Sequence, residues 1–251
     1  MEFRRVFDTI PEEFDRWRPR YCEAAFADIV RHAGLDARKS ALEIGPGTGQ
    51  ATEPILKTGC DYWAVELGER LADFMRGKFA GYENFHIVNA DFGTFGFGEK
   101  RFDLVYSAAT IQWIPEEIGF SRAYELLRPG GTFAMMLQKG EYRTSNEALY
   151  QEIQRVYDEF FHPETPYTQR LAYENVVNYG FVDLERREYP GQRVFTAEEY
   201  AAYLGTHCDH IVLREPDRAR FYEGIRGAIQ RAGNRLVMND TVVLYLAKKP
   251  G

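Results

Sequence analysis

Three glycines at every second position are the residues whose spacing most clearly suggests chemistry. Gly45, Gly47 and Gly49 follow a short apolar run that ends at Ile44, and a helical pattern can begin at Gln50. Glycine has no Cβ, so such a turn lets the chain bend sharply and lets a ligand lie directly against the backbone. Amides at the start of the next helix favour electronegative groups of that ligand. Taken alone, the turn also fits an ordinary strand-to-helix connection with no ligand.

Two acids further along the chain could bind the same ligand. Glu66 ends a second apolar run, at about the distance from Gly45 at which a βαβ unit places a carboxylate beside a ribose. One carboxylate can accept hydrogen bonds from both ribose hydroxyls. Asp91 and Phe92 follow a third run in the same way. Because ligands bind at the carboxyl ends of parallel strands, we expect these groups to converge. The alternatives are a surface glutamate and an aspartate that caps a turn.

The glycine spacing distinguishes two families of nucleotide-binding turn. A dinucleotide fingerprint would need a third glycine at position 50, where the chain has Gln50. The run from Glu43 to Gly49 instead resembles the first motif of the class I S-adenosylmethionine-dependent methyltransferases, in particular their small-molecule (type 11-like) group. Phe14 to Tyr21 and Thr110 to Pro115 are also similar to segments of these enzymes, as is the Leu-Arg-Pro-Gly-Gly turn that ends at Gly131.

This resemblance covers roughly residues 10 to 140 and the terminal strands. It implies an α/β fold, with a Rossmann-like, seven-stranded, mostly parallel sheet, helices on both faces and a small helical cap. It also implies S-adenosylmethionine as the cofactor. In the family, an acid at the place of Asp91 receives the adenine amino group, and the next residue packs on the ring. Arg18 would pair with the cofactor's carboxylate, or it is a solvated arginine beside Pro19. The residues predicted to bind the cofactor are Arg18, Glu43, Gly45, Pro46, Gly47, Gly49, Glu66, Leu67, Asp91, Phe92, Ala108 and Gln112.

The acceptor side of the reaction is less defined. A methyl group that leaves a sulfonium is transferred by in-line displacement, so the protein mainly positions the reactants and excludes water. A general base is needed only if the acceptor is protonated. His207, Tyr167 and Tyr203 are the candidates, because they lie in segments expected to form the substrate pocket and can exchange protons or hydrogen bond. Each is also compatible with a pocket wall or a satisfied core group.

The pattern along the chain predicts a single domain, and the resemblance implies that it is a methyltransferase domain. Its parts are an N-terminal helical lid (1–35), a cofactor-binding core (36–138), a cap insertion (139–180), and C-terminal strands and helices that complete the sheet (181–251). Within the insertion, Leu149, Ile153, Val156 and Phe160 recur at helical spacing and are more typical of core than of a cofactor site. An insertion at this place is expected to act as a lid over the substrate.

Composition limits the partners. Hydrophobic residues make up 45% and charged residues 27%, which is typical of a soluble globular protein. The start lacks a signal peptide and no apolar run is long enough to cross a membrane. A net charge of −7 argues against nucleic acid. Three scattered cysteines favour reduced thiols. We therefore expect a cytoplasmic monomer or homodimer with a small-molecule substrate, no nucleic acid, no membrane partner and no metal.

Two other functions stay open from the sequence. The chain could be a regulatory protein that holds the cofactor without transferring methyl, because the acceptor side has no diagnostic catalytic residue. A nicotinamide-dependent oxidoreductase is disfavoured by Gln50. The signature of enzymes that methylate exocyclic amines of nucleobases is absent from Tyr106 to Ala109. The identity of the acceptor atom depends on pocket shape, which motifs do not encode.

Overall fold

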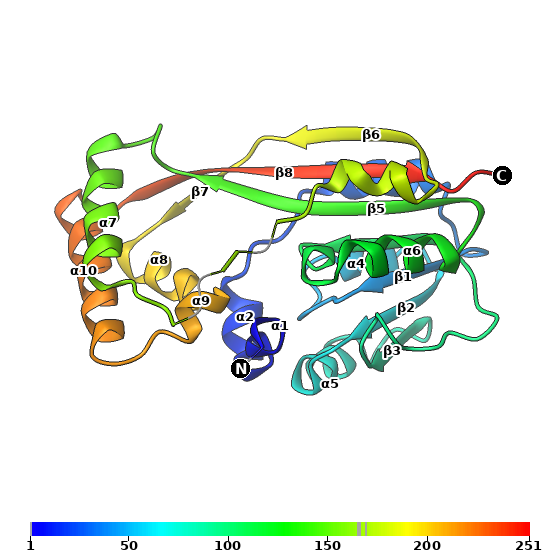
Figure 1. The fold of residues 1–251 in the computed structure, drawn as a ribbon, viewed down its shortest axis with the longest axis horizontal. Coiled ribbons are helices and arrows are strands. Elements are labelled where there is room, and N and C mark those ends of the chain that lie inside the picture. Colours follow the sequence, from blue (N-terminus) through cyan, green and yellow to red (C-terminus); the bar gives the residue numbers. More distant parts are fainter. Residues whose placement is uncertain (1, 165–166, 169) are drawn as a thin grey trace. The chain divides into compact units, whose positions relative to one another are not determined.

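The computed structural model describes residues 2–164, 167–168 and 170–251 (Figure 1). Its contacts divide the chain into two compact units. Unit 1 comprises Met1–Arg18, Lys139–Thr168 and Pro190–Thr241, and unit 2 comprises Pro19–Gln138, Gln169–Tyr189 and Val242–Gly251. The predicted cap insertion, 139–180, is thus divided, because its second part packs with the residues of unit 2.

The central sheet, over the described residues, has eight strands in the order β3-β2-β1-β4-β5-β8-β6, with β7 paired to β8. Strands β1 to β5 pair in parallel with one another, whereas β6 and β7 run antiparallel to β8. The strands are β1 (Ser40–Ile44), β2 (Asp61–Glu66), β3 (Phe85–Asn89), β4 (Phe102–Ala108), β5 (Leu127–Glu141), β6 (Val182–Tyr189), β7 (Gln192–Phe195) and β8 (Leu236–Lys248).

The predicted α/β class and mostly parallel sheet are confirmed, but the predicted strand number of seven is wrong. The additional strand is β7, which pairs through Gln192 with Asn239 and through Phe195 with Leu236. Its four residues are too few and too polar to show a strand pattern. Strand β5 also begins earlier than predicted, because Arg128 to Gly131 lie within the strand, beside an irregular register with β4.

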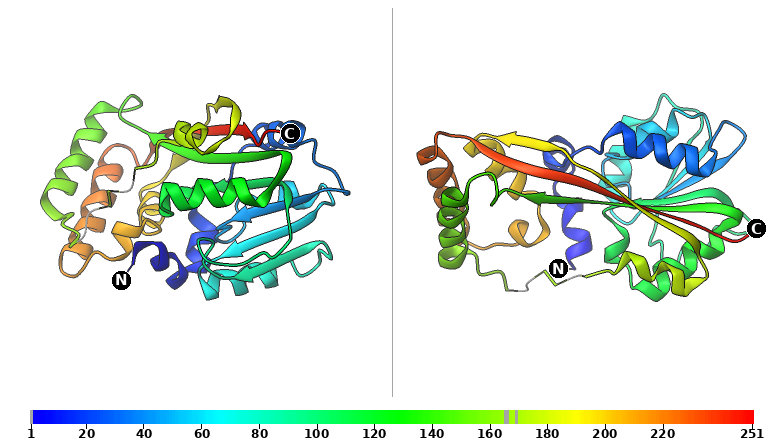
Figure 2. Two further views of the ribbon diagram at one scale, coloured as in Figure 1. Left: turned by 45° about the vertical axis from the view of Figure 1, so that its right-hand side comes forward. Right: turned by 90° about the horizontal axis from the view of Figure 1, so that it is seen from above.

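Unit 2 buries both faces of its sheet, as parallel strands require. Along β1, Ala41 packs into one apolar cluster, whereas Leu42 and Ile44 pack into the other. The first face is covered by α3 (Glu23–Ala33), α4 (Thr52–Leu56) and α5 (Glu69–Lys78). The second is covered by α6 (Glu116–Leu126) and the 3₁₀ helix η3 (Tyr173–Tyr179). Figure 2 shows α3 and α6 on opposite sides of the sheet. A further 3₁₀ helix, η2 (Ile111–Trp113), follows β4.

Unit 1 is mainly helical and has its own apolar core. Helices α7 and α10 lie side by side (Figures 1 and 2), and Leu149 and Ile153 of α7 are buried against Phe221 and Ile225 of α10. The helical pattern predicted for the insertion is thus confirmed as core. The helices of this unit are α1 (Phe3–Val6), η1 (Phe7–Thr9), α2 (Pro11–Trp17), α7 (Glu147–Phe160), α8 (Ala197–Leu204), α9 (Cys208–Ile211) and α10 (Asp217–Arg231).

Local signals in the sequence explain several helix ends. Pro19 lies between two helices, because α2 ends at Trp17 and α3 begins at Glu23. Helix α8 begins with a capping box, in which Thr196 is the N-cap and Glu199 occupies the third helical position. In the ranges that the structure describes, no helix combines the length and apolar character needed to cross a membrane.

Candidate cofactor site and catalytic groups

The glycine turn after β1 depends on backbone conformations that only glycine adopts freely. Gly45, Gly47 and Gly49 have φ values of +60°, +60° and +86°. A Cβ on Gly45 would lie 2.2 Å from Cγ2 of Thr110, and one on Gly49 would lie 2.6 Å from the Phe79 ring. The turn therefore needs glycine for conformation and for space.

Glu66, at the end of β2, directly contacts this turn. Its carboxylate accepts a hydrogen bond from the Gly47 amide at 3.0 Å and another from the Gly68 amide at 2.9 Å. The side chain is only 6% exposed. A carboxylate can accept about four hydrogen bonds, so this type of group suits the two hydroxyls of a diol. The predicted partnership between the glycine turn and an acid one strand away is thus present in the fold.

Asp91 follows the adjacent strand end. The Ala90 amide donates to the Glu66 carbonyl oxygen at 2.9 Å, which ties the ends of β2 and β3 together. Oδ1 of Asp91 accepts from the Gly93 amide at 2.8 Å, so the turn-capping alternative is present. The next residue, Phe92, is buried, and the Arg122 guanidinium lies 5.6 Å from its ring centre. Roles for Asp91 and Phe92 at adenine stay predictions.

The end of β4 meets the glycine turn from the other side. Thr110 donates from Oγ1 to the Gly45 carbonyl oxygen at 2.8 Å. Gln112 donates to the Ala109 carbonyl oxygen at 2.9 Å and accepts from the Tyr173 hydroxyl at 3.1 Å, which fixes its amide orientation. Ala108 is half-buried at the end of the strand. This edge therefore holds Gln112 in one orientation beside the turn.

Two further predicted residues complete the turn. Pro46 is buried, and its carbonyl oxygen accepts from the Gly49 amide at 2.9 Å. Leu67 is half-buried, and its carbonyl oxygen accepts from the Asn89 side-chain amide at 3.2 Å. Both residues make these contacts through their backbone, so their conformation matters more than their side-chain chemistry.

Glu43 differs from the other predicted cofactor residues because it is almost wholly buried, at 1% exposure. Oε2 accepts from Thr52 Oγ1 at 2.6 Å and makes a short hydrogen bond with the Tyr62 hydroxyl. Burial raises the pKa of this carboxyl, although its hydroxyl partners oppose the rise. The structure thus surrounds Glu43 with protein groups under the turn, and direct contact with a cofactor stays a prediction.

Arg18 belongs to unit 1, whereas the other residues predicted to bind the cofactor belong to unit 2. Nη2 donates to the Thr206 carbonyl oxygen at 3.0 Å, and the guanidinium lies 5.2 Å from the centre of the Phe14 ring. The alternative of a solvated arginine is wrong, because the side chain is half-buried and hydrogen bonded. Pairing with a cofactor carboxylate stays a prediction.

His207 is the best defined of the three catalytic candidates. Its Nδ1 lies 3.2 Å from the Leu204 carbonyl oxygen, a group that can only accept, so Nδ1 carries a proton. Burial, and then the positive charge of Arg18, lower the pKa of His207 well below its usual value. A neutral ring with Nδ1 protonated has its lone pair on Nε2, and such an atom can accept a proton.

Tyr203 and Tyr167, the other candidates, also lie in unit 1. The Tyr203 ring packs edge-on to His207 at 4.7 Å and stacks on Phe195 at 5.4 Å. Tyr167 is half-buried and lies outside any helix or strand. The structure thus brings Tyr203 to His207, whereas a catalytic part for Tyr167 stays a prediction.

The other histidine of this segment belongs to a hydrogen-bonded chain. His210 Nδ1 lies 2.7 Å from Asp209 Oδ1, and its Nε2 lies 2.9 Å from the Tyr157 hydroxyl. Both ring nitrogens are therefore engaged by the protein. Across the described ranges, no three His, Cys, Asp or Glu side chains are grouped so that they could hold a metal ion.

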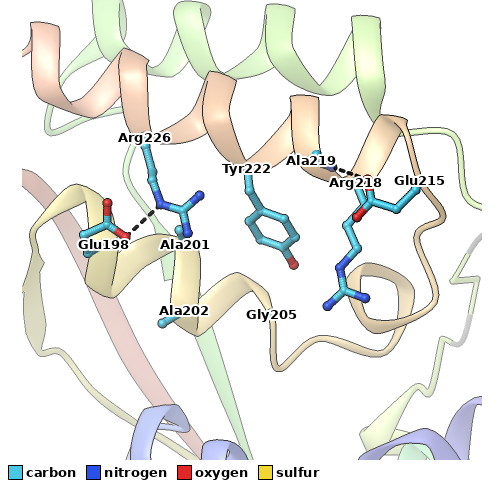
Figure 3. Close-up of a pocket in the computed structure, with 9 residues that line it drawn as sticks. All are labelled: Glu198, Ala201, Ala202, Gly205, Glu215, Arg218, Ala219, Tyr222 and Arg226. Atoms are coloured by element: carbon cyan, nitrogen blue, oxygen red, sulfur yellow. Dashed lines mark hydrogen bonds and ion pairs between the residues drawn. The ribbon is translucent and has the colours of Figure 1, made fainter.

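A surface pocket of about 500 Å³ lies between α8 and α10 in unit 1 (Figure 3). Its wall carries an ion pair, Arg226 to Glu198 at 2.8 Å, and its floor includes Ala201 and Gly205. The buried Tyr222 hydroxyl has no hydrogen-bond partner in the described part of the chain. None of the predicted site residues lines this pocket.

Motif spacing alone missed several residues that shape the candidate site. Thr110 contacts Gly45, Gly68 donates to Glu66, and Tyr173 orients Gln112. Tyr62 and Tyr106 meet beneath the turn. For Tyr62 and Tyr106, the only signal in the sequence is a hydroxyl group within a strand pattern that is otherwise apolar. No local pattern could have indicated Tyr173, because it is 61 residues from Gln112.

Solved structures that share this fold include a methyltransferase and a protein whose name does not state its function. The chain gives a TM-score of 0.59 with phosphoethanolamine N-methyltransferase 2 of Haemonchus contortus, at 18% identity, covering 100% of this chain and 61% of that one. That structure contains phosphomonomethylethanolamine and S-adenosylhomocysteine. The YcgJ protein of Bacillus subtilis gives a TM-score of 0.60 at 10% identity, covering 92% of this chain and all of that one. At these identities the likeness concerns the fold.

The sequence comparisons define the class more closely. Residues 42–135 match the model of a family described as a methyltransferase domain. This segment therefore has the sequence pattern of a methyltransferase domain, and the fold agrees with the resemblance predicted from the sequence.

Named relatives match only in part. Ribosomal RNA small subunit methyltransferase A of Dehalococcoides mccartyi is 40% identical over 63 residues, which cover 25% of this chain and 22% of the relative. Demethylmenaquinone methyltransferase of Tropheryma whipplei is 23% identical over 145 residues, or 52% of this chain and 56% of the relative. The chain thus spans about a quarter of the first of these relatives and about half of the second.

Proposed function

We propose that the protein is an S-adenosylmethionine-dependent methyltransferase that acts on a small molecule. The observation that carries the proposal is the contact between the Gly47 amide and the Glu66 carboxylate at 3.0 Å. It joins the glycine turn to a carboxylate, a group that can accept hydrogen bonds from both hydroxyls of a ribose. The methyltransferase family match and the fold support the same conclusion.

The residues of unit 2 fit the cofactor. Gly45 and Gly49 leave space where a Cβ would collide with neighbouring side chains. We infer that the turn holds the amino-acid end of the cofactor, that Glu66 accepts from the ribose hydroxyls, and that Asp91 and Phe92 bind adenine. When bound, S-adenosylmethionine supplies a methyl group on a sulfonium that an acceptor can displace in line. The protein then contributes orientation and exclusion of water.

The residues of unit 1 fit an acceptor that must lose a proton. His207 is held neutral, with its lone pair on Nε2, so it can receive that proton without first being deprotonated. Tyr203 packs against the ring and limits its rotation. We propose His207 as the general base, with Tyr203 and Tyr167 as the other candidates, and Arg18 as the partner of the cofactor's carboxylate.

A small acceptor is favoured over a nucleic acid by charge. The net charge is −7, which repels a polyanion at low salt. The relative from Tropheryma whipplei is named for a small quinone-type acceptor and matches over more of this chain than the ribosomal RNA enzyme does. We also propose a cytoplasmic monomer or homodimer, which size-exclusion chromatography of the purified chain would test.

Calorimetry with S-adenosylhomocysteine tests cofactor binding. We expect the intact protein to bind, Glu66→Ala to weaken binding about tenfold or more through loss of charge-assisted hydrogen bonds, and Gly47→Val to abolish it. Glu83→Ala is the matched control, because Glu83 is an exposed acid of the same unit. No binding by the intact protein would contradict the assignment, and a melting-temperature shift with NAD(H) alone would favour an oxidoreductase.

A labelled methyl donor tests transfer and identifies the acceptor class. The protein is incubated with S-adenosylmethionine carrying a labelled methyl group and with a cell extract separated into metabolites, RNA and protein. We expect label in the metabolite fraction, and a loss of most of it with His207→Ala. Label in RNA would refute the small-molecule proposal. Binding with no label in any fraction would favour the alternative, a regulatory protein that holds the cofactor.

A further inference from the structure

Three polar side chains meet beneath the glycine turn, on a face of the sheet that is mostly apolar. Tyr106 on β4 lies directly opposite Glu43 on β1 in the strand register. Tyr62 on β2 lies opposite Ala41, two residues before Glu43 and therefore on the same face. Tyr62 and Tyr106 are both 0% exposed. The register of three adjacent strands thus brings one carboxyl and two phenols into a buried space.

Four contacts link these groups to the chain that follows the turn. Thr52, the first residue of α4, contacts Glu43 Oε2 at 2.6 Å, and the Tyr62 hydroxyl contacts the same oxygen. The Tyr62 and Tyr106 hydroxyls lie 2.8 Å apart. The Tyr106 hydroxyl also lies 3.3 Å from the Ala51 carbonyl oxygen. The chain of contacts therefore runs from Glu43 to the backbone two residues beyond Gly49.

The number of protons available decides the state of Glu43. Each of the four contacts needs one hydrogen, and the Ala51 carbonyl oxygen can only accept. The hydroxyls of Thr52, Tyr62 and Tyr106 supply three hydrogens, so an ionised Glu43 would leave one of these contacts without a hydrogen, and the longest of them joins Tyr106 to the Ala51 carbonyl oxygen at 3.3 Å. A protonated carboxyl supplies the fourth. Glu43 then donates to Tyr62, Tyr62 to Tyr106, and Tyr106 to Ala51, while Thr52 donates to Glu43.

The electrostatic surroundings agree with this count. An ionised carboxylate in an apolar interior is costly unless a cation pairs with it. The groups that act on Glu43 among the described residues are hydroxyls, with burial as the largest influence on its pKa. The two phenols also have raised pKa values because of burial, so both remain neutral donors.

We propose that Glu43 is a neutral carboxylic acid that positions the glycine turn through Tyr62 and Tyr106, instead of pairing as an anion with the cofactor. This deepens the proposed function, because its effect on the cofactor rests on the turn being the binding site. Thr52 and Ala51 fix the start of α4, and hence the end of the turn. Tyr62 and Tyr106 are positioning residues, since neither needs to touch the cofactor.

Infrared spectroscopy of the intact protein tests the protonation state without any ligand. Protein with ¹³C-labelled glutamate carboxyls is compared with labelled Glu43→Gln at neutral pH. The expected difference spectrum shows the C=O stretch of a protonated carboxylic acid in the wild type and its absence in Glu43→Gln. A difference that contains only carboxylate bands would overturn the proposal. This result is independent of methyl transfer and of cofactor binding.

Calorimetry of tyrosine variants tests the positioning role. Tyr106→Phe keeps the ring and removes the link to Ala51, so the Kd for S-adenosylhomocysteine is expected to rise roughly three- to tenfold, the effect of one hydrogen bond. Tyr82→Phe is the matched control, because the Tyr82 hydroxyl contacts exposed Glu53 instead. An unchanged Kd for Tyr106→Phe would overturn the role. If Tyr106→Phe does not fold, Tyr62→Phe gives the same comparison, with melting temperature recorded for each variant. If the wild type itself binds no S-adenosylhomocysteine, the proposed function fails, while the infrared result still decides the state of Glu43.

Discussion

At the scale of single residues, the candidate site depends on space as much as on charge. Gly45 shows this most clearly, because the position that a Cβ would take is filled by Thr110. The same threonine donates to the Gly45 carbonyl oxygen, so it both closes the turn and excludes larger residues from it. The identity of one residue is therefore set by a side chain 65 positions away.

Gly45→Ala is expected to destabilise the protein by about 2 to 3 kcal/mol, because it adds a collision to an unfavourable positive φ. Urea unfolding measures the loss. The double variant with Thr110→Ala should recover part of it, since the colliding methyl group is gone. Gly81→Ala is the control, because a Cβ there meets nothing within 4 Å. Equal losses for Gly45→Ala and Gly81→Ala would contradict the explanation.

Tyr222 gives the opposite case, a buried polar atom whose removal is expected to do no harm. Its hydroxyl has no partner in the described part of the chain, and burial raises its pKa to about 12, so it stays neutral. Tyr222→Phe should leave the free energy of unfolding unchanged or raise it by up to about 1 kcal/mol.

Tyr157→Phe provides the contrast to Tyr222→Phe, because the Tyr157 hydroxyl lies 2.9 Å from His210 Nε2. This variant is expected to lose about 1 to 2 kcal/mol, since the buried ring nitrogen loses its partner. Thermal unfolding of both variants measures the difference. A larger loss for Tyr222→Phe than for Tyr157→Phe would show that the Tyr222 hydroxyl has a partner in solution, such as an ordered water molecule.

At the scale of elements, helix α8 helps to position His207, the proposed general base, which follows the end of this helix. The helix begins at a capping box, in which Thr196 accepts from the Glu199 amide and Glu199 accepts from the Thr196 amide at 2.8 Å. It ends at Leu204, whose carbonyl oxygen orients His207. A local sequence motif at one end of the helix thus supports the placement of a functional group just beyond the other end.

Thr196→Ala and Glu199→Ala are each expected to cost about 1 kcal/mol of unfolding free energy. Because the two side chains satisfy each other's backbone amides, the double variant should cost less than the sum of the two single losses. A double-mutant cycle by urea unfolding measures this coupling. Strict additivity would indicate that the two side chains act independently.

At the scale of the whole molecule, stability should depend on pH through His207. Its folded pKa lies well below the unfolded value near 6.5. As pH falls below about 6.5, the unfolded chain binds a proton that the folded protein does not, so the contribution of a neutral His207 to stability is lost. It is fully present above that pH.

Comparison of the wild type with His207→Gln isolates this effect, because other titrating groups are common to both proteins. The free energy of unfolding of the wild type relative to His207→Gln should decrease as the pH is lowered from 7 to 5, both values chosen to bracket the unfolded pKa. Urea titrations at several pH values measure it. A difference that does not vary with pH would mean that His207 has the same pKa in both states.

The sequence by itself determined the fold class and most of the cofactor edge. Glycine spacing, strand-like apolar runs and acids at run ends are local features, and parallel strands bring their carboxyl ends to one edge, so contact between Gly47 and Glu66 could be expected. The capping box of α8 and the break before α3 are local in the same sense. By contrast, β7 was missed because its four residues, two of them polar, are too few to show a periodic pattern and depend on β8 for pairing.

Tertiary structure alone decided how these residues are supported. Strand register brought Tyr62 and Tyr106 to Glu43. The fold also places Tyr173 in contact with Gln112, although the two residues are 61 positions apart in the sequence. It also placed Arg18 beside Thr206 and, electrostatically, beside His207. Such contacts join residues far apart in the chain, and their distances follow from packing that no local pattern encodes. The protonation states of Glu43 and His207 depend on that packing, because burial and neighbouring charges set them.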